Sequence, residues 1–121
     1  MQRTNLAKYV LIASLAFLFV WFGVDKLLHP ATWVGWMPGW MDGLLGMDME
    51  VWLNVVGVTE FMLGILLLIP IQKVRLVTAG VIILHLLFVV FQVGWNDIVV
   101  RDIALLGSAV ALLLLLLERK R

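Results

Sequence analysis

One carboxylate of this chain, Glu60, stands in the middle of a predominantly apolar segment that runs from Trp52 to Ile69. A charged group at membrane depth costs about 3 kcal/mol or more to insert, so it normally faces protein or water and has a partner. The neighbouring segments contain other side chains able to do chemistry, and together with Glu60 they form the candidate ligand-binding or polar cluster: Asp25, Lys26, His29, His85, Gln92, Arg101 and Asp102.

Each member of this cluster has a structural reading beside the functional one. In the structural reading Glu60 forms an interhelical ion pair, and in the functional reading it handles a proton or a ligand. His85 suits an interhelical hydrogen bond, and His29 suits a helix end near the lipid headgroups. Because guanidinium is the natural bidentate partner of a carboxylate, we expect Arg101 to pair with Glu60. The expected assembly opens outward, with His85 at its base and the other members around it: Glu60, Arg101, Gln92, Asp25 and Lys26.

Several kinds of chemistry are excluded. The two histidines and the scattered carboxylates do not form a specific metal site, so we expect no metal. Because the chain has no cysteine, it cannot by itself carry out thiol redox chemistry or ligate an iron–sulfur cluster. The sequence encodes no cofactor, and quinone is the one that we consider. Whether the chain is an enzyme is left open.

The elements that position these residues follow from composition. Hydrophobic residues make up 64% of the 121 positions and charged residues 14%, which is typical of an integral membrane protein. Each of the apolar segments is near the ~20 residues that cross a bilayer. We therefore predict an all-α fold, a single antiparallel bundle of four transmembrane helices over residues 1–121, with the helices at Lys8–Leu28, Val51–Ile69, Leu76–Trp95 and Val99–Leu117.

Basic residues orient this bundle. Seven of the nine fall on one predicted side: Arg3, Lys8, Lys73, Arg75, Arg119, Lys120 and Arg121. That side should be cytoplasmic, with both termini inside, and the membrane should be the inner membrane of a prokaryote. The long outer connection is rich in Trp, Met and Gly. Since tryptophan prefers the membrane–water boundary, Trp33, Trp36 and Trp40 act as an interfacial anchor or as a lid over the bundle.

Helical spacing predicts which face of each helix turns inward. We expect small and polar residues to face the bundle, because small residues let helices approach closely in lipid. The expected stripes, in chain order, are Ser14, Phe17, Trp21, Asp25 and Leu28; Asn54, Gly57, Glu60, Phe61 and Gly64; Thr78, Val81, His85, Phe88, Gln92 and Trp95; Arg101, Ala104, Gly107, Ser108 and Ala111.

Three short motifs occur in the order of a known family: Phe22-Gly-Val-Asp-Lys-Leu-Leu-His-Pro30, Gly57-Val-Thr-Glu60 and Val100-Arg-Asp-Ile-Ala-Leu-Leu-Gly107. In this order, and in length and topology, the chain resembles the DoxX family of small four-helix membrane proteins. It is similar to the DoxX-like branch, because the first helix lacks an early basic residue. The resemblance implies a subunit of a quinone-linked oxidoreductase, a partner in a redox-defence complex, or a chaperone for membrane-protein assembly.

Two function classes follow. The first is a non-catalytic membrane subunit, scaffold or assembly factor, and we place it first. The alternative is a quinone- or lipid-binding subunit of an oxidoreductase, in which Glu60 handles protons and electrons come from a partner or a bound cofactor. The expected partners are the lipid bilayer, a membrane or redox protein, and a second copy of the chain, with no nucleic acid.

Overall fold

The computed structural model describes residues 2–93 and 97–118 and contains no strand within them. Its long helices are α1 (Arg3–Leu28), α3 (Met49–Leu68), α4 (Gln72–Val93) and α5 (Asp97–Leu117). The short helix α2 (Pro30–Val34) and the 3-10 turns η1 (Gly39–Met41) and η2 (Leu44–Gly46) connect α1 to α3. Within the described residues, four helices are long and apolar enough to cross a membrane, as the sequence predicts. Trp95 lies outside the described residues.

The long helices start before the predicted apolar segments, and local hydrogen bonds stabilise their ends. Each long helix begins two to five residues before the predicted segment, because polar residues continue the helical hydrogen bonds beyond the apolar part. Asp48 caps α3, since its side chain accepts a hydrogen bond from the backbone N–H of Val51 at 2.9 Å. At the other end of α3, Arg75 donates from Nε to the carbonyl of Leu67 at 3.0 Å, which satisfies an orphan acceptor.

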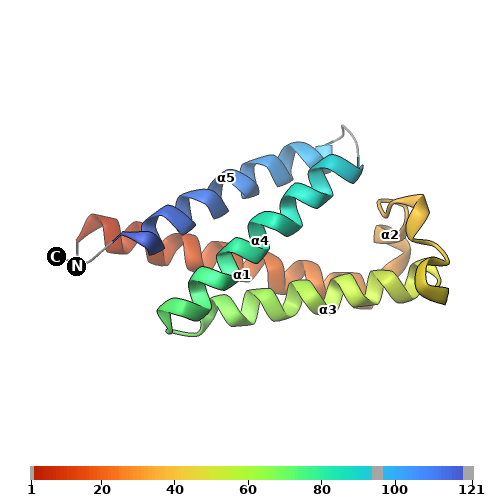
Figure 1. Cartoon of the computed structure of the whole chain (residues 1–121), viewed down its shortest axis with the longest axis horizontal. Helices are drawn as coiled ribbons and strands as arrows, with labels where there is room; N and C mark the ends of the chain where they lie inside the picture. The colour runs from red at the N-terminus through yellow and green to blue at the C-terminus, as the bar shows by residue number, and fades with distance from the viewer. Residues whose placement is uncertain (1, 94–96, 119–121) are drawn as a thin grey trace.

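The molecule has two distinct ends (Figure 1). The start of α1, the end of α5 and the turn between α3 and α4 lie at one end, called here the termini end. Gln72 of α4 donates a hydrogen bond there to the carbonyl of Leu116 in α5. The segments α2, η1 and η2 lie at the opposite loop end, where α4 and α5 diverge from α1 and α3.

Glycines bring α1 and α3 into close contact. A Cβ atom added to Gly23 would lie 2.5 Å from the carbonyl oxygen of Gly57, and one added to Gly64 would lie 2.9 Å from the carbonyl oxygen of Ala16. The two backbones are therefore too close for any larger residue at these positions. Such small-residue contacts are how helices associate in lipid, where hydrophobicity cannot favour a helix over an acyl chain.

The predicted inward stripe holds for α3 but not for every helix. Gly57, Glu60 and Gly64 are buried as expected, although Asn54 is exposed. The stripes expected on α1 and α5 were wrong, since Phe17, Trp21 and the small residues from Ala104 to Ala111 point mainly outward, apart from Ala109. The buried core is instead formed by large apolar side chains and three alanines from all four long helices. Its members are Ile12, Leu15, Ala16, Phe19, Phe22, Leu63, Leu67, Ala79, Ile82, Leu86, Leu105, Ala109, Leu112 and Leu116.

Candidate functional site

Glu60 is the point at which three helices meet. Its Oε1 lies 2.6 Å from Nζ of Lys26 on α1, and its Oε2 lies 3.4 Å from Nε2 of His85 on α4. The Lys26 ammonium and the Glu60 carboxylate form a close, buried ion pair. The expected pairing of Glu60 with Arg101 is replaced by these two contacts. The three residues Lys26, Glu60 and His85 are called here the triad.

Lys26 reaches Glu60 because the glycine contact brings its helix close. It lies three residues after Gly23, and its Cβ would be 3.2 Å from a Cβ at Gly57, one turn before Glu60. Its Nζ also lies 4.0 Å from the centre of the Trp33 ring and 5.4 Å from that of Phe22. Since an aromatic face attracts a cation, these rings stabilise a charge that is otherwise almost fully buried.

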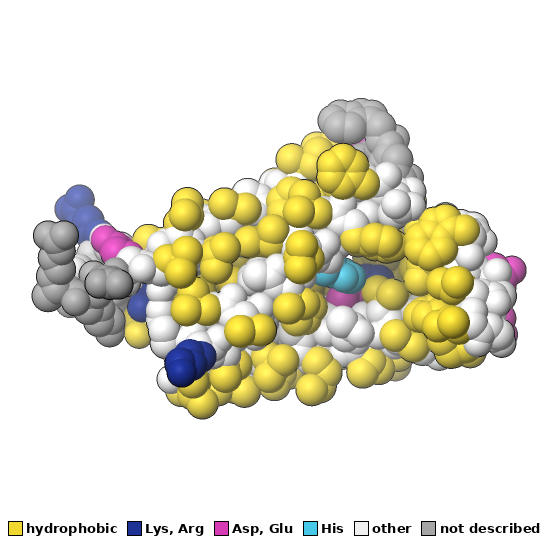
Figure 2. All heavy atoms as spheres, in the orientation of Figure 1, with side chains coloured by type: hydrophobic (Ala, Val, Ile, Leu, Met, Phe, Trp, Pro, Cys, Tyr) yellow, Lys and Arg dark blue, Asp and Glu magenta, His cyan; other side chains and the backbone are white. Residues whose placement is uncertain are grey.

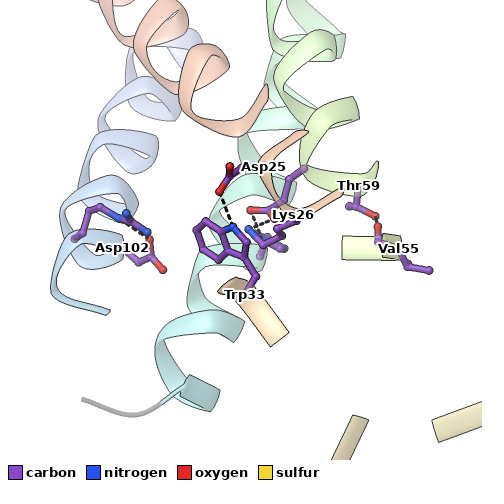
Figure 3. Close-up of polar contacts among 9 residues, drawn as sticks. Asp25, Lys26, Trp33, Val55, Thr59 and Asp102 are labelled. Atoms are coloured by element: carbon purple, nitrogen blue, oxygen red, sulfur yellow. Dashed lines mark hydrogen bonds and ion pairs between the residues drawn. The ribbon is translucent and has the colours of Figure 1, made fainter. Parts of the chain in front are cut away.

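Asp25, next along α1, fixes the start of the loop. Trp33 donates from Nε1 to Oδ2 of Asp25 at 2.7 Å, and Nδ1 of His29 lies 3.0 Å from Oδ1 of the same carboxylate. Figure 3 shows this link, with the Trp33 indole between α2 and the end of α1. Asp25 therefore positions Trp33, and Trp33 in turn covers Lys26.

Arg101 and Asp102 begin the wall that α5 contributes. Nε of Arg101 lies 3.8 Å from Oδ1 of Asp102, which is too long for a hydrogen bond. The guanidinium lies 4.8 Å from the centre of the Phe22 ring and is about half exposed. The Asp102 side chain is only 9% exposed. Arg101 thus lies over an aromatic ring and Asp102 lies inward of it.

The loop also reaches α4. Trp40 donates from Nε1 to Oε1 of Gln92 at 3.1 Å, and its ring packs edge-on against Phe88 with 6.0 Å between ring centres. Both Trp40 and Gln92 are exposed, so water or lipid headgroups can compete for this bond. The contact joins the loop to the helix pair that diverges from α1 and α3.

These groups surround one cavity at the loop end, with an empty volume of about 760 Å³ including its open mouth. In Figure 2 a hollow between hydrophobic surfaces exposes histidine, acidic and basic atoms. The triad, Gln92, Arg101 and Asp102 contribute its polar atoms. The rest of its lining is apolar or aromatic: Phe19, Phe22, Trp33, Trp36, Met37, Pro38, Met41, Val56, Leu86, Phe88 and Val89.

Most residues of the expected cluster therefore lie on one cavity. Asp25 and His29 are the exceptions, because they hold the loop in place and do not line the cavity. Trp33 and Trp36 line it, whereas Trp40 lies at its side against α4. The predicted stripe that contains His85 and Gln92 included Phe88, which lines the cavity. Sequence reasoning did not assign Phe22 to the site, and the one available signal was its helical spacing from Lys26, at i−4.

No three His, Cys, Asp or Glu side chains come together in the described part of the chain in a way that could hold a metal ion. Comparison with known proteins adds no assignment, since no protein-family model, curated protein or solved structure matches this chain. Its site therefore has to be interpreted from its own geometry.

Proposed function

We propose that this chain is an integral membrane protein that binds a small amphiphile in the loop-end cavity, with the head of the ligand against the triad and its tail toward lipid. The observation that carries the proposal is the cavity itself, which combines apolar and aromatic walls with a few convergent polar groups. This combination is typical of small-molecule sites. Scaffolding alone does not require a cavity with buried charges on its floor.

A proton-handling role for Glu60 is part of this proposal. Its carboxylate lies between the Lys26 ammonium and the His85 ring, at 2.6 and 3.4 Å, and all three side chains line the cavity. A histidine ring can accept a proton on one nitrogen and donate one from the other, so His85 can pass a proton between Glu60 and a bound ligand. An alkyl quinone is a suitable probe, because its ring oxygens accept hydrogen bonds or protons.

The test fills the cavity without touching the triad. Val89 lines the cavity on α4, whereas Val77 of the same helix is 67% exposed away from it. Wild-type protein in detergent or nanodiscs should bind a decyl-substituted quinone saturably, as followed by tryptophan fluorescence. Val89→Trp should abolish this binding and Val77→Trp should retain it. Equal binding by both variants would place the ligand elsewhere, and no saturable binding to the wild type would contradict the proposal.

A scaffold or assembly role is the second candidate, and one surface favours it. At the loop end, Leu44 and Leu45 are 39% and 81% exposed, and Leu45 has the left-handed φ of 55° that a leucine rarely adopts. An exposed leucine held in this way suits contact with a partner or with lipid. Leu45→Gly should then release a co-purifying membrane protein while quinone binding is unchanged.

The orientation belongs to the same proposal. Arg3, Lys8, Lys73 and Arg75 lie near the termini end, so this end faces the cytoplasm and the cavity faces outward. The chain has no cysteine, so Gly43→Cys and Lys73→Cys can be labelled singly in intact cells. An impermeant thiol reagent should label the first and not the second. The resemblance to the DoxX family and the inner-membrane location stay predictions.

A further inference from the structure

Two carboxylates line the cavity, and they differ in how close their charged partners lie. Both oxygens of Glu60 have partners, Lys26 and His85. Asp102 is almost as buried, with 9% of its side chain exposed, yet its single polar contact within the described ranges is Nε of Arg101 at 3.8 Å. No donor within the described residues makes a hydrogen bond to this carboxylate, so it can accept one from a bound molecule.

The position of Asp102 in its helix does not explain this burial. An acidic residue stabilises a helix N-terminus, but the effect falls off within the first turn. Asp97 already begins α5, and Asp102 lies beyond that first turn. Since Asp102 lines the cavity, a molecule that enters the cavity can supply a donor to it.

Charge and shape limit the chemistry of that donor. Beside His85, the cavity is lined by two basic residues, Lys26 and Arg101, and by two acidic residues, Glu60 and Asp102. A ligand ammonium or phosphate would add an unbalanced charge in a poorly solvated site, where charges cost most. A hydroxyl group donates a hydrogen bond without adding charge. The nearby rings favour a flat aromatic carrier, since aromatic pairs gain from edge-to-face contact.

We propose that Asp102 is the ligand-recognition residue of this cavity and accepts a hydrogen bond from the hydroxyl of a neutral phenolic amphiphile. The assignment rests on the proposed function, because it names the ligand class of the same site. The phenol ring would pack near Phe22 and Trp33, which already contact each other edge-on at 5.9 Å. Its alkyl tail would leave by the open mouth. Glu60 then keeps its two partners when the ligand binds.

The test compares two probes that differ in one donor, para-octylphenol and its methyl ether, para-octylanisole. Wild-type full-length protein in nanodiscs should bind the phenol about tenfold more tightly, because only the phenol can donate a hydrogen bond to Asp102. Asp102→Leu should lose this preference and bind both probes with the affinity of the ether. Asp102→Asn keeps an acceptor oxygen and should retain part of the preference. Asp97→Asn, which removes a charge from the same helix outside the cavity, should behave as wild type.

The outcomes separate this inference from the proposed function. Saturable binding of both probes with equal affinity to the wild type would overturn the role of Asp102 and leave the amphiphile site standing. An unchanged preference in a folded Asp102→Leu would overturn it as well. If the phenol, its methyl ether and the decyl quinone all fail to bind, both the role of Asp102 and the proposed amphiphile site are overturned. A preference lost in Asp102→Leu and kept in Asp97→Asn would support the assignment.

Discussion

Glu60 lies between two regions of opposite character. On one side α1 and α3 touch through Gly23, Gly57 and Gly64, and no space remains between the backbones. On the other side α3 and α4 diverge at the loop end around the cavity, which is lined by large side chains such as Phe88. In lipid, close contact between helices requires small residues, and bulky side chains keep them apart. The size of the facing residues therefore decides which side of Glu60 is closed and which can admit a ligand.

The largest expected effect comes from the charge pair that joins the two regions. Lys26→Met would leave Glu60 buried with only His85 beside it, because Lys26 is its closest partner at 2.6 Å. Removing one member of a buried pair typically costs about 3–5 kcal/mol, whereas removing both is much milder. Thermal unfolding in detergent should show a large loss for Lys26→Met and partial recovery when Glu60→Gln is added.

The control for this cycle is Lys73→Met, at an exposed position of the termini end. It should leave the free energy of unfolding nearly unchanged. A double variant that loses the sum of both single losses would show that Lys26 and Glu60 are not coupled and that the close contact contributes little.

A second prediction concerns the closed side alone. Gly23→Ala would place a methyl group 2.5 Å from a backbone oxygen of α3, so the helices must separate. Overpacking of this kind costs about 1–3 kcal/mol. Gly57→Ala, whose nearest atom is at 3.1 Å, should cost less. Gly107→Ala has nothing within 4 Å and should be tolerated. If Gly23→Ala and Gly107→Ala unfold at the same temperature, α1 and α3 are not in contact as described.

The smallest effect is expected on the open side. Arg101 is about half exposed, and its contact with Asp102 is long at 3.8 Å, so Arg101→Gln should lower the free energy of unfolding by less than about 1 kcal/mol. Its combination with Glu60→Gln should be additive, because the two residues form no ion pair. A double-mutant cycle in detergent measures this, and a coupling of several kcal/mol would restore the pairing that the sequence suggested.

The sequence predicted which polar residues belong to the site, but it did not predict which of them contact one another. Lys26, Glu60, His85, Gln92, Arg101 and Asp102 all line the cavity, and each stood out as a polar side chain in or beside an apolar segment. The choice of partner did not follow from residue type. Arg101 was favoured because guanidinium suits carboxylate, but the glycine contact between α1 and α3 places Lys26 nearer.

The sequence by itself determined the four apolar helices, the lack of thiol chemistry and the need of Glu60 for a partner, because these follow from hydropathy, composition and the cost of burying a charge. The tertiary structure alone decided which faces of α1 and α5 turn inward. In a membrane the lipid-facing and protein-facing sides are both apolar, so helical periodicity hardly distinguishes them. Only the packed helices show where backbones meet, where a cavity remains and that Asp102 faces it.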